Sequence, residues 1–155
     1  MSKVRIHLTA TLLIMAFIFF QSALPGELSG AESSFIVDRI TRILDTDAET
    51  VSFIVRKLAH FTEYLILGIF LALDTRDIAD RRHEETVSAF IWIVPFFIGA
   101  LYAATDELHQ SFVPGRSCEL RDVMIDSAGV AAGALILILM KRKANSTYGE
   151  DKEEL

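Results

Sequence analysis

Ionisable and hydrogen-bonding side chains interrupt the apolar stretches of this sequence or stand at their ends. Side chains of these types serve general acid–base catalysis, metal binding or the recognition of a polar ligand. The candidate binding residues are Lys57, His60, Glu63, Tyr64, Asp106, Glu107, His109, Gln110, Arg116, Asp122 and Asp126. Four of them are also candidates for a catalytic role as acid, base or orienting group, namely His60, Glu63, His109 and Asp122.

Two kinds of site fit these residues without a metal. The first is a structural network of buried hydrogen bonds and ion pairs, because the acids are nearly matched in number by Arg56, Lys57, Arg116 and Arg121. The second is a binding site for an anion or a lipid headgroup. Arg116 and Arg121 suit it, because a guanidinium contacts phosphate or carboxylate through two parallel N–H groups.

The third kind of site is a metal centre. His60 and Glu63 stand three residues apart, and His109 with Glu107 or Asp106 would add further histidine and carboxylate ligands. The spacing does not make a complete metal signature, and we predict no metal and no other cofactor. The sequence also lacks a nucleophile motif and a phosphate-binding loop, which favours a non-enzymatic role over catalysis.

The elements that must position these residues are long and apolar. Hydrophobic residues make up 52% of the 155 residues and charged residues 23%, at a mean hydropathy of +0.39. The apolar residues concentrate in segments 6–24, 58–73, 87–105 and 123–140. A helix of about 20 apolar residues crosses a ~30 Å hydrocarbon layer, where backbone groups find no water and must bond within a helix. The sequence therefore predicts an all-α polytopic membrane protein with four transmembrane helices.

Charge and cysteine content exclude other classes. The net charge is −6, with 15 Lys and Arg against 21 Asp and Glu, whereas nucleic-acid binding requires a basic surface. The single cysteine, Cys118, excludes an intrachain disulfide framework and a cysteine-rich zinc site. We predict one four-helix domain over residues 1–145 and an acidic, disordered tail over residues 146–155.

The connections between the spans carry their own signals. Apolar residues at near-helical spacing from residue 35 to 44 predict a short amphipathic helix in the membrane interface. Thr46 and Glu49 fit a capping box, so the second long helix is expected from about residue 47 to 73. The charge run over residues 74–86 is expected to be a solvated connector. Gly129 and Gly133, four residues apart, predict close helix packing.

The distribution of Lys and Arg predicts the orientation. With a cytoplasmic N-terminus, the inner side collects eight Lys and Arg residues, three of them at 141–143, and the outer side four, with two at the border. We therefore predict a multi-pass protein of the cell membrane with both termini in the cytoplasm. The ionisable residues of the second, third and fourth spans then gather on the outer side.

Several motifs, in this order, resemble the VanZ-like family over residues 8 to 140. They are the run from Arg56 to Tyr64 (RKLAHFTEY) with Gly68, the run from Asp106 to Gln110 (DELHQ), Pro114-Gly115-Arg116, and Asp122 with Gly129 and Gly133. The Gln21-Ser22 to Pro25-Gly26 exit from the first span also looks like the family's pattern. This chain departs from it at Asp126, where the family often has asparagine.

The resemblance implies a function in the cell envelope, because the family takes its name from a protein associated with resistance to teicoplanin, a glycopeptide antibiotic. We expect an integral membrane protein that binds a lipid-linked or cell-wall component, or an anionic lipid, in an outer-facing polar pocket and so lowers glycopeptide susceptibility. The alternative is a membrane-embedded enzyme, such as a metal-dependent hydrolase or transferase, acting on an amphipathic envelope substrate. A transporter is less favoured, since four spans are few and no internal repeat is visible.

Overall fold

The computed structural model describes residues 3–25, 35–43, 45–81 and 88–153, and these are overwhelmingly helical. The long helices are α1 (Lys3–Ser22), α3 (Ala48–Arg81), α4 (Ser88–Gln110) and α5 (Leu120–Glu153), with a short helix over residues 35–43. Each long helix contains a stretch long and apolar enough to cross a membrane. The prediction of an all-α polytopic membrane protein is confirmed. The interfacial position of the short helix stays a prediction.

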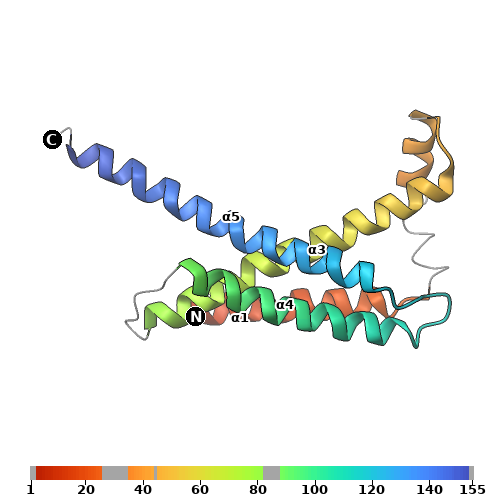
Figure 1. Ribbon diagram of the computed structural model, residues 1–155, viewed down its shortest axis with the longest axis horizontal. Coiled ribbons are helices and arrows are strands. Elements are labelled where there is room, and N and C mark those ends of the chain that lie inside the picture. The colour runs from red at the N-terminus through yellow and green to blue at the C-terminus, as the bar shows by residue number, and fades with distance from the viewer. Residues whose placement is uncertain (1–2, 26–34, 44, 82–87, 154–155) are drawn as a thin grey trace.

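Helix α3 makes the most extensive contacts of the long helices, and it packs against α1, α4 and α5. Its most extensive contact is with α5, and the middle of α3 crosses the N-terminal part of α5, while α1 and α4 run alongside each other (Figure 1). Buried apolar side chains at this crossing form the core, among them Tyr64, Leu67 and Val130. We call the two ends of the bundle the Arg116 end and the His7 end, after a residue at each.

Glycine permits the crossing of α3 and α5. A Cβ added to Gly133 would lie 2.9 Å from the backbone nitrogen of Ile69, and one added to Gly68 would lie 2.7 Å from Cα of Val130. Backbone atoms cannot yield as a flexible side chain can, so only glycine allows this approach. The close packing predicted for Gly129 and Gly133 is confirmed.

The start of α3 agrees with the predicted position, but a different residue caps it. The backbone N–H of Thr50 donates to Oδ1 of Asp47 at 2.7 Å, which makes Asp47 the N-cap and not Thr46. The same hydrogen bond holds the pKa of the exposed Asp47 carboxyl below its usual value.

The end of α3 corrects the prediction of a solvated connector from residue 74. The helix continues to Arg81, and its side chains Asp74 and Asp77 are buried against α1. Thr11 Oγ1 donates to Asp74 Oδ2 at 2.6 Å, and His7 Nδ1 lies 2.8 Å from Asp77 Oδ2. Because α1 supplies these partners, the carboxylates lie inside the bundle and the helix does not end there. The rest of the predicted connector, residues 82–86, lies outside the described residues.

Helix α5 passes the predicted boundary between domain and tail. It continues to Glu153, so no helix end coincides with residue 145. The division at that residue stays a prediction.

Candidate functional site

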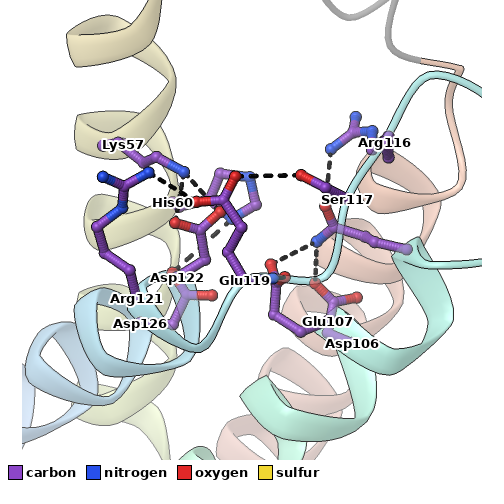
Figure 2. Close-up of polar contacts among 11 residues, drawn as sticks. Lys57, His60, Asp106, Glu107, Arg116, Ser117, Glu119, Arg121, Asp122 and Asp126 are labelled. Atoms are coloured by element: carbon purple, nitrogen blue, oxygen red, sulfur yellow. Dashed lines mark hydrogen bonds and ion pairs between the residues drawn. The ribbon is translucent and has the colours of Figure 1, made fainter.

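The Arg116 end gathers nearly all the candidate residues in one place, where the C-terminal ends of α1 and α4 meet the N-terminal half of α3 and the first turns of α5 (Figure 2). We call this group the polar cluster. Its members are Lys57, His60, Glu63, Tyr64, Asp106, Glu107, Gln110, Arg116, Glu119, Arg121, Asp122 and Asp126. The members that Figure 2 labels fall into two halves, one between α3 and α5 and one on α4 and the loop that follows it.

The half between α3 and α5 contains one close ion pair. Lys57 Nζ bonds both carboxylate oxygens of Asp122, at 2.5 Å for Oδ2. One helical turn further on, His60 Nδ1 lies 3.8 Å from Oδ1 of Asp126, too far for a hydrogen bond. Helical spacing explains both pairs, because Lys57 and His60 share one face of α3 and Asp122 and Asp126 share one face of α5.

The half on α4 contains two buried acids bonded by neutral donors. Asp106 accepts from Ser22 Oγ at 2.5 Å and from Gln110 Nε2 at 3.1 Å. Glu107 accepts from the same Gln110 nitrogen at 3.2 Å and from the backbone N–H of Glu119 at 3.0 Å. No cation is needed to satisfy these oxygens, so this half ties α1, α4 and the following loop together.

Arg116 bonds chiefly to backbone. Pro114 and the left-handed Gly115 (φ 75°) make a tight turn, in which the N–H of Arg116 donates to the carbonyl of Val113 at 3.1 Å. The turn directs the guanidinium at α1, where Nε donates to Leu24 O and Nη2 to Gln21 O, each at 3.0 Å.

These contacts bond the carbonyl of Gln21, in the last turn of α1, and that of Leu24, two residues beyond the helix, where carbonyls have no partner within the helix. A third bond runs from Arg116 Nη1 to Gln110 Oε1 at 3.2 Å. Burial of the guanidinium lowers the pKa of Arg116, although nearby carboxylates oppose this shift. Three of the five N–H donors of Arg116 therefore bond within the protein.

Glu119 stands between the two halves of the cluster (Figure 2). Its carboxylate accepts from Arg121 Nη2 at 2.6 Å and from Ser117 Oγ at 3.1 Å. The hydrogen bond from Arg121 lowers the pKa of this exposed carboxyl. Arg121, like Arg116, is thus engaged within the protein, and the anion contacts expected of both arginines are not available through these N–H groups.

Several polar atoms of the cluster lack a hydrogen bond. Asp126 is 0% exposed, and neither of its carboxylate oxygens has a partner in the described part of the chain. The same holds for the hydroxyl of Tyr64, which is also 0% exposed, and for Nδ1 of His60. Glu63 is half-buried, near enough to Asp106 and Arg116 for their charges to act on it. Buried polar atoms are nearly always bonded, so these unbonded atoms set this part of the cluster apart from the rest.

His109 is the predicted site residue that the structure sets apart. Its ring stacks on Phe19 of α1 with 4.5 Å between ring centroids, and its Nδ1 has no hydrogen bond among the described residues. It packs α4 against α1 and makes no bond to the polar cluster in that part of the chain. Nor do the described residues include a group of three or more His, Cys, Asp and Glu that could hold a metal ion.

Sequence reasoning missed two sets of polar residues. Glu119 belongs to the polar cluster and Ser22 donates to it at Asp106, whereas His7 and Thr11 bind the carboxylates at the opposite end of α3. One signal could have found the second set. His7 and Thr11 are four residues apart and share a face of the first span, which in lipid requires partners.

Comparison with known proteins gives one family match. A family model described as VanZ/LLP1 matches residues 7–141, nearly the whole chain, and this range includes every member of the polar cluster. No curated protein and no solved structure matches the chain.

Proposed function

Because the chain belongs to the VanZ/LLP1 family of membrane proteins, we propose that it is a cell-envelope protein whose Arg116 end binds a lipid-linked or cell-wall component. Binding there would lower the susceptibility of the cell to a glycopeptide antibiotic such as teicoplanin. One observation carries the proposal. The polar cluster brings four helices together, yet Asp126, Tyr64 and His60 keep unbonded polar atoms inside it.

The chemistry of the cluster supports binding through the α3–α5 half. Lys57 pairs with Asp122, and Arg116 and Arg121 bond within the protein. What is left for a ligand is Asp126, with the Tyr64 hydroxyl and the His60 ring, and the half-buried Glu63 nearby. A headgroup that bonds to these atoms would remove the cost of leaving them buried and unbonded.

We further propose that the Arg116 end faces outward, as the Lys and Arg distribution predicts. Cys118 is exposed in the loop at that end. A membrane-impermeant maleimide added to intact cells is therefore expected to label Cys118. The Cys118→Ser chain is the control and should stay unlabelled. Labelling only after permeabilisation would place the Arg116 end in the cytoplasm.

The function is tested by teicoplanin susceptibility in a susceptible host that expresses the chain. We expect the wild-type chain to raise the minimal inhibitory concentration above that of vector-only cells. Glu63→Gln should accumulate normally, because no hydrogen bond to Glu63 is found in the described structure, but should lose most of the protection. Losing a bond to a charged group costs about 1.5–3 kcal/mol, which weakens binding about tenfold or more.

The matched control is Glu49→Gln. It makes the same change on the same helix at an exposed position, about 21 Å from Glu63 at 1.5 Å per residue. It should protect as the wild type does. If Glu63→Gln accumulates and protects fully, the polar cluster is not the functional site. If wild-type and vector-only cells are equally susceptible, the proposed role in glycopeptide protection is wrong.

A further inference from the structure

The buried part of the polar cluster contains more acids than bases. Glu63, Asp106, Glu107, Asp122 and Asp126 are buried or half-buried, whereas the cations that lie among them are Lys57 and Arg116. Arg56 is exposed, and Arg121 pairs outside this group with the exposed Glu119. A site with this balance attracts a positively charged group and repels an anion.

The excess negative charge of the cluster is concentrated on one side chain. Hydrogen-bond donors of the protein satisfy Asp106 and Glu107, and Lys57 satisfies Asp122. Asp126 has no such donor, although it is 0% exposed. A buried carboxylate without a partner is among the costliest arrangements in a protein interior.

The neighbours of Asp126 complete a set of acceptors. The Cβ of Tyr64 packs against α5 at Gly129, three residues after Asp126, and the Tyr64 hydroxyl is unbonded. His60 Nδ1 lies 3.8 Å from Asp126 Oδ1, and the His60 side chain is 16% exposed, so the buried carboxylate neighbours a side chain that reaches the surface of the bundle. Two carboxylate oxygens and one hydroxyl oxygen provide three acceptors, and a primary ammonium carries three N–H donors.

We propose that Asp126, with Tyr64 and His60 beside it, binds a primary ammonium group. The inference rests on the proposed function, since it names the chemical class of the headgroup that the Arg116 end would bind. A metal ion fits less well, because the described residues offer no group of three metal-ligating side chains. The ammonium can belong to a lipid headgroup or to a soluble amine, and the experiment separates these sources.

The test titrates the purified full-length chain in detergent micelles with lipids and follows binding by native mass spectrometry. The probes are phosphatidylethanolamine, its N-methyl and N,N-dimethyl forms, and phosphatidylcholine, which share the phosphate and lose one N–H at each step. We expect affinity to fall along this series, by about tenfold or more in total. Soluble phosphoethanolamine serves as competitor: weak competition assigns the ammonium to a lipid, and competition as strong as that of the lipid assigns it to a soluble amine.

Asp126→Asn should abolish this preference, because it replaces the carboxylate by an amide of nearly the same size. Asp74→Asn, the same change at the His7 end, is the matched control and should keep the preference. Equal affinity of the wild-type chain for all four lipids would overturn the proposal, and so would a preference that survives in Asp126→Asn. The methylation series on the wild-type chain needs no substitution, so it decides the matter even if Asp126→Asn fails to fold.

The two proposals fail in distinguishable ways. Loss of the ammonium preference in Asp126→Asn with unchanged teicoplanin susceptibility supports the binding site and rejects the protective role. Protection by a wild-type chain that binds all four lipids equally supports the role and rejects the ammonium site.

Discussion

Gly133→Ala is expected to destabilise the folded protein strongly. The added Cβ would collide with the carbonyl oxygen of Leu65 and lie 2.9 Å from the nitrogen of Ile69, and both atoms belong to the backbone of α3. The two helices must then separate along their whole contact. Overpacking costs about 1–3 kcal/mol when side chains can yield, so we expect at least the upper end of that range.

Thermal unfolding in detergent, followed by circular dichroism, measures this effect, together with the yield of monodisperse protein. The control is Ala128→Val, which adds more volume to the same helix at an exposed position and should unfold like the wild type. Unfolding of Gly133→Ala at the wild-type temperature would show that α3 and α5 do not pack as closely as described.

Arg116→Ala should be the second most damaging change. It removes the hydrogen bonds to Gln21 O, Leu24 O and the Gln110 amide, which join the end of α1 to the rest of the bundle. Bonds to charged groups contribute about 1.5–3 kcal/mol each and do not add fully, so we expect a loss of about 3 kcal/mol. Hydrogen exchange should rise in residues 18–25, and the unfolding temperature should fall.

Two variants make the Arg116 result specific. Arg116→Lys keeps the charge but loses the planar fork that reaches both carbonyls, so it should fall between wild type and alanine. Arg121→Ala removes an exposed arginine that pairs with Glu119 and lies over the Phe53 ring at 5.0 Å, and little change is expected. If Arg116→Ala has the hydrogen exchange and the unfolding temperature of the wild type, Arg116 does not hold α1 in place. The anion-binding role predicted from the sequence would then be favoured.

The sequence predicted all four spans because the cost of exposing a backbone to lipid depends mainly on local composition. The end of α3 was missed for the same reason. Asp74 and Asp77 look like loop residues when only their neighbours are considered, whereas their partners Thr11 and His7 come 63 and 70 residues earlier. Periodicity within a segment contains no information about such distant partners.

The site was predictable where side chains pair with side chains. Lys57 and Asp122 were expected to belong to one charged network, and they form its closest ion pair. The partners of Arg116 are carbonyl oxygens, which every residue carries, so no residue type signals them. Their choice depends on the direction that the turn at Gly115 imposes. The unbonded state of Asp126 depends in turn on the spacing of α3 and α5, which only a three-dimensional structure provides.

The way α1 is held has a consequence for biogenesis. Only 11% of the apolar stretch of α1 is buried inside the bundle, against 39% of the apolar stretch of α3. Lipid provides no hydrophobic force between helices, so burial cannot hold α1 in place. Polar bonds instead hold α1 at Thr11 and Ser22 and at the Met15 carbonyl, which accepts from Tyr102. All these partners lie on α3 and α4, which are synthesised later. Helix α1 must therefore reside in the bilayer without these partners until α3 and α4 have been synthesised.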